Sequence, residues 1–413
     1  MKLTYCWWHY LLLALILLTG IGLRFYQLDK IKDYYFDEVY HVPTAKMIAK
    51  YDQRAYEWHH SELRDEIQSG AFIDWLHPPL AKLFQAASIL FFGDNSFAWR
   101  AASALFGSLL LIVIYMLTRI ICPEYHWAAL LATGLAAIDG LSIAQSRIAM
   151  NDIFVTFFMT AGVLIYYLYL QKNHAGRWLV PLALTCGLAI SSKWSGIYLL
   201  VFIAIWEVGV EGIKRHRSVG KILGLGCFLA SVSLLVYLLS YFQLFTTHPS
   251  KHFIELHQQI FAYQLHLNAT HPYQSKAWEW PLGLKPVYLY YNPQTKAQLF
   301  NRPFYPGWLV GLLGIIGSTI LLGSYAWQWC QLKIPKNTKC RPRWNTQKIR
   351  DLSFLLLAYY CFWIFWCFSP RIMFFYHYLP ASALIWVIAA VIATIIKDIL
   401  PQRLKIKQKG THA

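Results

Sequence analysis

The chain has 413 residues, of which 57% are hydrophobic and only 14% are charged, and its formal net charge is +17. This composition excludes an ordinary soluble protein, in which roughly a quarter of the residues are charged, and indicates a polytopic membrane protein. It does not favour nucleic-acid binding, because the basic residues alternate with apolar runs of membrane-spanning length, which is the pattern of orientation signals.

The first apolar run, Trp7 to Leu28, is long enough to cross roughly 30 Å of hydrocarbon at about 1.5 Å per residue. We interpret it as a membrane helix and not as a signal peptide, because no small-residue cleavage site follows and a polar segment begins at Asp29. The run from Trp178 to Ile190 is the shortest and is marginal for a complete span. The ten predicted spans are Trp7–Leu28, Trp99–Thr118, Trp127–Ala144, Ile153–Leu170, Trp178–Ile190, Ile197–Val210, Ile222–Tyr241, Tyr305–Trp327, Leu352–Phe368 and Phe374–Ile396.

The basic residues predict the orientation of these spans, because cytoplasmic loops carry an excess of Lys and Arg. With the amino terminus inside, every inside segment is basic and both termini are cytoplasmic. The two long outer segments, 29–98 and 242–304, mix acidic and basic residues. We therefore predict a single transmembrane domain over residues 1–413 with two large outer loops. The inside cations are Arg119, Lys172, Arg177, Lys214, Arg215, Arg217, Lys221, Lys333, Lys336, Lys339, Arg341, Arg343, Lys348, Arg350, Lys397, Arg403, Lys405, Lys407 and Lys409.

The first outer loop carries an acidic pair, Asp37 and Glu38, among the aromatic residues of YYFDEVYH. Further along this loop His77 precedes two prolines, which should break the backbone, since proline lacks an amide donor and restricts the residue before it. The apolar stretch Leu80–Phe92 then suits a helix lying along the membrane interface. We expect the acidic pair to form the reaction centre at the water boundary, with the later half of the loop as its lid or rim.

Three isolated cations, Arg147, Lys193 and Arg371, lie in short outer turns at the ends of apolar runs. An ionisable group at membrane depth costs about 2.5 to 3.5 kcal/mol on insertion scales, so one that is retained there usually has a partner or a task. At helix ends a snorkelling anchor is the commoner role. The location of all three on the face that carries Asp37 and Glu38 favours a functional role.

Carboxylates and cations together at a membrane surface suit a lipid donor that carries its sugar on a phosphate. The cations bind the phosphate and stabilise it as a leaving group, while a carboxylate deprotonates an acceptor hydroxyl or holds a divalent cation. In an inverting transfer one carboxylate acts as the base, and the lipid phosphate leaves from the opposite side of the anomeric carbon. An Asp-Glu pair alone is a weak signal for this chemistry.

Longer sequence blocks add specificity. Six of them are FDEVYH at 36–41, HPPLAK at 77–82, WRAASALFG at 99–107, IDGLSIAQSRIAMND at 138–152, SSKWSG at 191–196 and RIMFFYHYLPA at 371–381. The seventh, HPYQSKAWEWPLGLKPVYLYY at 271–291, is the most specific, because its length and its tryptophan and proline content are hard to obtain from membrane composition alone. Together the blocks resemble the protein O-mannosyltransferases over most of the chain.

This resemblance implies an all-α GT-C glycosyltransferase in the lipid bilayer, with its active site on the outer face. Such enzymes transfer mannose, with inversion, from polyprenyl-phosphate or dolichyl-phosphate mannose to Ser or Thr hydroxyls of an acceptor protein. By motif the catalytic acids are Asp37 and Glu38, with Asp37 as the base. Asp152 matches a second acidic position, where it would assist a metal or orient Arg147. The donor-phosphate residues would be Arg100, Arg147, Lys193 and Arg371, and the substrate loops would carry His77, Asp152, His271, Tyr273, Trp278 and Trp280.

The chain departs from many eukaryotic members of that family in one respect. The segment 242–304 has only about 60 residues and leaves no room for their large β-rich module. The chain therefore looks like the compact bacterial type, which implies the inner (plasma) membrane. The aromatic residues of the HPYQSKAWEWP block either stack on a sugar or form an interfacial belt.

Alternative functions stay open from the sequence. Another GT-C enzyme would move a lipid-phosphate-linked sugar to lipid A or a cell-wall glycan. A transporter or flippase would line a path with ionisable residues, but the charges cluster on one face and the spans are nearly uncharged at their midplane. A homologue that has lost activity and acts as a partner subunit is disfavoured by the intact FDE and HPYQSKAWEWP motifs.

A divalent cation is left open at the acidic motif, but it is not expected among the outer histidines. His252 and Glu255 are three residues apart, yet the sequence contains no HExxH motif, and exposed helix histidines are more often solvated. The outer histidines considered are His59, His60, His252, His257 and His266.

Overall fold

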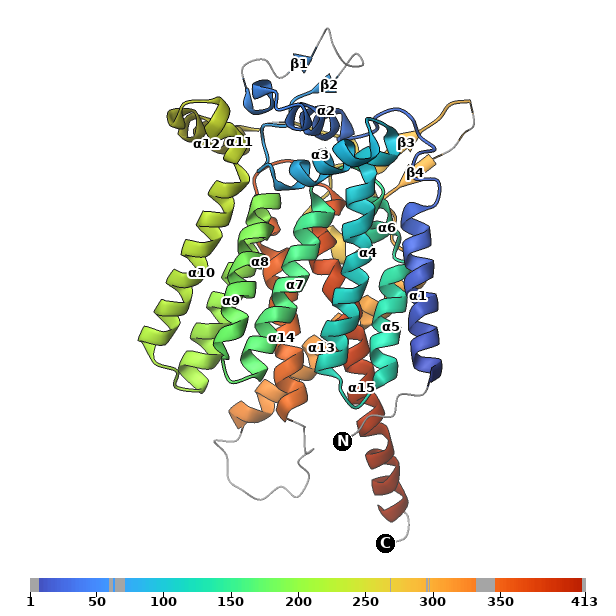
Figure 1. The fold of residues 1–413 in the computed structure, drawn as a ribbon. Helices are drawn as coiled ribbons and strands as arrows, with labels where there is room; N and C mark the ends of the chain where they lie inside the picture. Colours follow the sequence, from blue (N-terminus) through green and yellow to red (C-terminus); the bar gives the residue numbers. More distant parts are fainter. Residues whose placement is uncertain are drawn as a thin grey trace.

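The computed structural model describes residues 7–58, 62–63, 71–267, 269–294, 296, 298–331 and 346–410. Figure 1 shows a bundle of long, roughly parallel helices, with shorter helices and two hairpins gathered at one end. We call this end the outer end. The predicted outer histidines His59 and His60, and the inside cations Lys333, Lys336, Lys339, Arg341 and Arg343, lie outside the described residues.

The bundle is built from the apolar runs, which become helical because a helix satisfies its backbone hydrogen bonds internally in a medium without water. All ten runs predicted from the sequence occur as helices. The bundle helices are α1 (Trp7–Phe25), α4 (Ser96–Ile121), α5 (His126–Ala137) with α6 (Gly140–Ser146), α7 (Asp152–Gln171), α8 (Leu179–Ser192), α9 (Ile197–Trp206), α10 (Val219–Ser240), α13 (Tyr305–Gln331), α14 (Thr346–Trp363) and α15 (Leu379–Gly410).

The outer end collects the polar segments between these helices (Figure 1). Helix α3 begins directly after the His-Pro-Pro turn and has the bounds expected from the sequence. The outer elements are α2 (Glu38–Ala49), α3 (Leu80–Phe92), α11 (Phe242–Thr247), α12 (Ser250–His266) and two antiparallel pairs, β1 (Glu62–Leu63) with β2 (Ala71–Phe72) and β3 (Tyr288–Tyr291) with β4 (Gln298–Phe300). Single turns are η1 (Gln53–Tyr56), η2 (Gly176–Trp178), η3 (Trp194–Gly196), the π-helical η4 (Glu207–Lys214), η5 (Ala277–Leu282), η6 (Ile364–Phe368) and η7 (Phe375–Tyr378).

Within the described residues, eight helical segments are long and apolar enough to cross a membrane, or nine if the bent pair α5 and α6 counts as one span. The one remaining predicted span, Trp178–Ile190, corresponds to α8, which has 14 residues. At about 1.5 Å per residue it is shorter than the hydrocarbon core, as its marginal sequence length indicated. Helix α8 nevertheless packs between α7 and α10 in the bundle. The protein is therefore an integral membrane protein.

The bend between α5 and α6 is stabilised by a buried arginine from α1. The two helices meet at 60°, which leaves carbonyl groups at the end of α5 without partners in the helix. Arg24 is fully buried and donates from Nη1 to the carbonyl oxygen of Ala137 at 3.3 Å and from Nη2 to Ser142 Oγ at 2.9 Å. The sequence marked Arg24 only as an interruption of an apolar run, whereas the structure uses it to satisfy irregular backbone inside the bundle.

Helices α4 and α6 approach each other at Gly107, which gives the first prediction. A Cβ atom at this position would lie 2.0 Å from Ser146 Oγ. We expect Gly107→Ala to lower the free energy of unfolding by about 1 to 3 kcal/mol, as overpacking does. Thermal unfolding of the purified protein measures this change.

The matched control is Gly224→Ala in α10, where nothing lies within 4 Å of the added atom. That variant should be as stable as the parent or slightly more stable, because alanine favours helix over glycine. Adding Ser146→Gly to Gly107→Ala should restore part of the loss. Equal midpoints for Gly107→Ala and the parent would contradict the close packing of these helices.

Candidate functional site

Glu38 and Arg100 form a buried ion pair between the first outer segment and helix α4. The glutamate is fully buried, and its carboxylate accepts hydrogen bonds from Arg100 Nε at 2.8 Å and Nη2 at 2.7 Å. The same carboxylate accepts from the backbone amides of Tyr35 at 3.3 Å and Ala149 at 3.0 Å. One side chain therefore joins the segment after α1, the start of α4 and the turn before α7.

The remaining donors of Arg100 are also occupied. Nη1 and Nη2 donate to the carbonyl oxygens of Leu28, Ile31 and Asp33 at 3.2, 2.6 and 2.9 Å. The expectation that Arg100 binds the donor phosphate, and that Glu38 takes part in the reaction directly, does not fit these contacts. Both residues instead position the segment that carries Asp37, because breaking a buried, hydrogen-bonded charge pair is strongly destabilising.

Asp37 directly precedes α2 and lines a cavity of about 320 Å³ at the outer end of the bundle. Its Oδ2 accepts a hydrogen bond from the hydroxyl of Tyr376 at 3.3 Å. Burial raises the pKa of Asp37 above its usual range, and the nearby charges of His41 and Lys193 oppose that rise. A carboxylate with a raised pKa is a stronger base once ionised, so this position suits proton abstraction.

Two of the predicted cations also line this cavity. Lys193 follows the last residue of α8, and its Nζ donates to Asp152 Oδ1 at 2.8 Å. Arg371 donates from Nη1 to the side-chain oxygen of Gln264 in α12. Asp152 therefore pairs with Lys193 and not with Arg147, which corrects the suggestion that it orients Arg147.

Arg147 caps a helix instead of facing the cavity. Its Nη1 donates to the carbonyl oxygens of Leu23 at 3.0 Å and Tyr26 at 2.8 Å, at the end of α1. These are carbonyls that a helix terminus leaves without intrahelical partners, and a cation there also complements the helix dipole. The anchor alternative fits Arg147, and the predicted phosphate contact does not.

Asp74 is the centre of a polar network that the sequence reasoning missed. Its carboxylate lies 2.9 Å from His77 Nδ1, 2.9 Å from His41 Nδ1 and 2.9 Å from Lys82 Nζ. Burial acts to raise the pKa of Asp74, but the charges of Lys82, His77 and His41 hold it well below its usual range. The motifs FDEVYH and HPPLAK contain His41, His77 and Lys82. That all three side chains contact Asp74 became visible only in the fold.

His77 belongs to this network and lines the cavity, as its substrate-loop assignment expected. Burial lowers the pKa of His77 to about 4, although Asp74 opposes that change. The imidazole is therefore neutral near pH 7. It can accept or donate a single hydrogen bond there without adding a positive charge beside Lys193.

The HPYQSKAWEWP block packs against a residue that lines the cavity. Trp280 is fully buried, donates from Nε1 to Ser275 Oγ at 2.8 Å and stacks on His377 with ring centroids 6.1 Å apart. His377 itself lines the cavity. The amide of Ser275 donates to the carbonyl oxygen of Met373 at 2.9 Å, which joins the block to the turn that holds Arg371.

The other aromatic residues of this block lie away from the cavity. Trp278 is 57% exposed, Tyr273 stacks on Tyr288, and His271 contacts the ring of Phe374. Among the described residues, none of His271, Tyr273, Trp278 and Trp280 lines the cavity. Their direct contact with donor or acceptor stays a prediction, and the rings of His271, Tyr273 and Trp280 pack against neighbouring aromatic rings.

Tyr376 and Asn151 are among the cavity residues that carried no assignment from the sequence. Tyr376 bonds Asp37, and its ring centre lies 5.5 Å from Lys193 Nζ. The amide of Asn151 is buried and, in the described part of the chain, has no hydrogen-bond partner on either atom. A buried amide without a partner is costly, so Asn151 is available to a ligand in the cavity. Asn151 belongs to the motif IDGLSIAQSRIAMND and Tyr376 to RIMFFYHYLPA, so membership of these motifs was the one indication of a role in the site that the sequence offered.

Comparison with known proteins extends these observations. The family model described as dolichyl-phosphate-mannose-protein mannosyltransferase matches residues 14–255, and the model of the C-terminal four TMM region of protein-O-mannosyltransferase matches residues 249–412. The chain belongs to the protein mannosyltransferase family. It is therefore a glycosyltransferase, and the transporter and flippase alternatives are not supported.

Curated relatives carry matching names. The polyprenol-phosphate-mannose–protein mannosyltransferase of Mycobacterium tuberculosis is 24% identical over 446 residues, which cover 93% of this chain and 80% of that protein. The protein of the same name from Corynebacterium glutamicum is 26% identical over 280 residues, covering 52% of this chain and 53% of that protein. The similarity to the mycobacterial protein therefore extends over nearly the whole of this protein mannosyltransferase.

Solved structures share the GT-C fold. The Saccharomyces cerevisiae Pmt1-Pmt2 complex bound to the sugar donor matches with a TM-score of 0.73 and 14% identity, over 96% of this chain and 86% of that chain. ArnT from Cupriavidus metallidurans bound to undecaprenyl phosphate matches with a TM-score of 0.56 and 17% identity, over 94% of this chain and 60% of that chain. At these identities the matches establish the fold of this protein mannosyltransferase, which was the predicted class.

The depressed pKa of His77 predicts how stability depends on pH. Between pH 6.5 and about 4 the unfolded chain binds a proton at this residue and the folded chain does not. Stability should therefore fall as the pH falls through this window. Replacing the histidine by glutamine should flatten the dependence, as measured by thermal unfolding between pH 4 and 7.

The matched control is His266→Gln, which removes an exposed histidine at the end of α12. That variant should keep the slope of the parent. An unchanged slope in His77→Gln would show that another group governs acid unfolding.

Proposed function

We propose that this chain transfers mannose from polyprenyl-phosphate mannose to Ser or Thr hydroxyls of acceptor proteins, with inversion at the anomeric carbon. The observation that carries the proposal is the shared cavity of a carboxylate, Asp37, and two cations, Lys193 and Arg371. Family membership supports the sugar and the lipid phosphate. The named activity of the mycobacterial relative supports the protein acceptor.

The donor phosphate binds between Lys193 and Arg371 in this account. A phosphate leaving group gains negative charge as the sugar departs, and preorganised cations at that position stabilise the transition state. Lys193 already pairs with Asp152, so the donor phosphate would share this cation. Asn151 adds a free amide in the same cavity.

Asp37 acts as the general base on the acceptor hydroxyl. The proton moves from the hydroxyl oxygen to the carboxylate as that oxygen attacks the anomeric carbon and the bond to the lipid phosphate oxygen breaks. Attack from the side opposite the leaving group inverts the configuration. Tyr376 holds Asp37 through its hydroxyl group, so it positions the base. A divalent cation beside these acids stays a prediction, and no step described here depends on it.

The proposed site faces the extracytoplasmic side of a bacterial inner membrane, with both termini in the cytoplasm. The loops that join α4 to α5, α7 to α8 and α9 to α10 lie at the end of the bundle opposite α2 and α3 (Figure 1). These loops carry cations, among them Lys172, Arg177 and Arg215. Positive residues favour the cytoplasmic side, which supports this orientation.

The test of function is transfer of radiolabelled mannose from polyprenyl-phosphate mannose to a Ser/Thr-rich peptide by the purified protein in lipid. We expect alkali-labile label on the peptide. Asp37→Asn should lower the rate by about 100- to 10,000-fold, the usual contribution of a general base, with donor binding retained. Parent-like turnover in Asp37→Asn would remove Asp37 from the mechanism. Label on a lipid or a glycan in place of the peptide would contradict the protein acceptor.

The cations make separable predictions about donor use. Lys193→Ala and Arg371→Ala should each lower kcat/KM for the donor by about 10- to 100-fold, the effect of a lost hydrogen bond to a charged group. Arg147→Ala should lower thermal stability and leave the donor KM of the folded fraction unchanged, because its guanidinium holds the end of α1.

Lys251→Ala is the matched control, because this cation on α12 is exposed and pairs only weakly with Glu255 at 4.0 Å. Its kinetics should equal those of the parent. A raised donor KM in Arg147→Ala together with parent-like kinetics in Lys193→Ala would reverse the assignment.

A further inference from the structure

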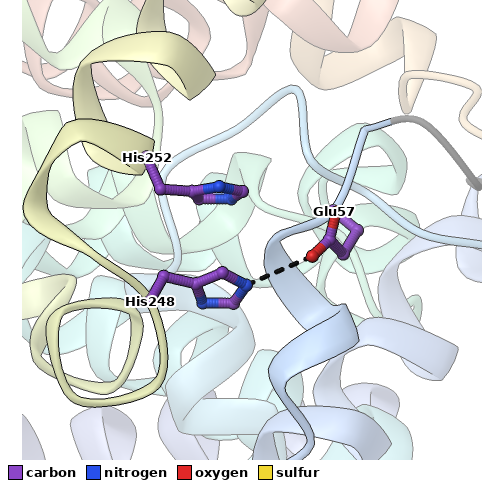
Figure 2. A group of neighbouring side chains, drawn as sticks. All are labelled: Glu57, His248 and His252. Carbon is purple, nitrogen blue, oxygen red and sulfur yellow. Dashed lines mark hydrogen bonds and ion pairs between the residues drawn. The ribbon is translucent and has the colours of Figure 1, made fainter.

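A second group of ligand-type side chains lies at the outer end, apart from the cavity of the proposed reaction. It contains Glu57, after turn η1, and two histidines, His248 and His252, at the junction of α11 and α12. Figure 2 shows both imidazole rings pointing from that junction toward Glu57 across the gap between the two segments. His248 Nε2 lies 3.2 Å from Glu57 Oε1.

The distances within this group suit a metal ion. One ligand atom from each residue lies within 4.8 Å of the others. Tetrahedral Zn²⁺ with ligands at about 2.1 Å separates them by about 3.4 Å, so side-chain adjustments on the order of 1 Å close the site. Two imidazoles and a carboxylate form one of the common three-residue zinc sets, in which water fills the open position.

Neighbouring contacts already orient both rings. His248 Nδ1 lies 2.9 Å from the hydroxyl of Thr247, and His252 Nε2 lies 3.2 Å from the carbonyl oxygen of Tyr56. Such outer contacts fix the tautomer and orientation of histidine ligands in metal sites. They reduce the rearrangement that binding requires.

The two rings also pack against each other, and the group is open to solvent. The imidazoles of His248 and His252 stack with centroids 4.2 Å apart and planes inclined by 24°. The side chain of Glu57 is 32% exposed, so an ion can enter from solvent.

We propose that Glu57, His248 and His252 bind one divalent cation with a preference for imidazole and carboxylate ligands, Zn²⁺ foremost. The ion joins the first outer segment to the second. Glu57 and His248 are 191 residues apart, so the link is between distant parts of the chain. For the same reason sequence spacing did not predict it, and the pair considered there, His252 with Glu255, is not the pair found.

The link has a consequence for the cavity. Trp58 follows Glu57 directly, lines the cavity and has its ring centroid 4.6 Å from that of His252. A metal ion at this site therefore fixes one wall of the cavity. The metal-binding proposal itself does not depend on the proposed mannosyl transfer.

The test uses the full chain, purified in detergent without a histidine tag, treated with EDTA and desalted. Zn²⁺ affinity is measured by competition with a chromogenic chelator, and Co²⁺ serves as a spectroscopic probe of ligand geometry. We expect one Zn²⁺ per chain in the parent. The double variant His248→Gln/His252→Gln should bind Zn²⁺ at least about 100-fold more weakly. Loss of a residue that only contacts a ligand typically lowers metal affinity by about 10- to 100-fold, and loss of the ligands themselves should lower it further.

His266→Gln is the control, since it removes an exposed histidine of the same helix, and it should bind as the parent does. Zn²⁺ should also raise the thermal midpoint of the parent and of this control, but not that of the double variant. If the double variant does not fold, Glu57→Gln replaces it and should also bind more weakly. Absence of stoichiometric Zn²⁺ in the parent, or parent-like affinity in the ligand variants, would overturn the proposal.

Discussion

The buried pair of Glu38 and Arg100 is the interaction on which the candidate site depends. It connects the segment after α1, the start of α4 and the turn before α7 through one carboxylate and one guanidinium. Removing either charge leaves the other buried without its counter-ion, which costs about 3 to 5 kcal/mol. Asp37 is the residue next to this ion pair, so the pair holds the segment that carries the Asp37 carboxylate at the cavity.

The four cations predicted to bind the donor phosphate divide into two groups by what surrounds them. Arg100 and Arg147 lie among backbone carbonyl groups at the end of α1 and in the segment after it, and their fork-shaped donors are used there. Lys193 and Arg371 line the cavity beside acidic or amide side chains. The first group fixes the framework, and the second is the one to which we assign the donor phosphate in our proposal. This separation lets the site combine a rigid scaffold with charges that can engage a ligand.

The sequence predicted the elements that depend on local composition. Apolar runs predicted the bundle helices, and the prolines after His77 predicted the start of α3. It named Asp37 as the base, but it also assigned Glu38 to catalysis and placed Arg147 with Lys193 at the donor phosphate, because the contacts that separate these residues join distant parts of the chain. The sequence also did not predict the bend between α5 and α6, because Arg24, which stabilises the bend, belongs to another helix. Motif spacing pointed to several residues that line one cavity, while their separate contacts became visible only in the fold.

In the proposed reaction the donor phosphate lies at Lys193 and Arg371 with the sugar facing Asp37. The most direct measurement of this placement is a cryo-EM structure of the Asp37→Asn variant with polyprenyl-phosphate mannose bound. We expect the phosphate within hydrogen-bond distance of the two cations, the anomeric carbon facing residue 37, and an intact pair of Glu38 with Arg100. A phosphate bound to Arg100 or Arg147, or a sugar turned away from residue 37, would contradict it.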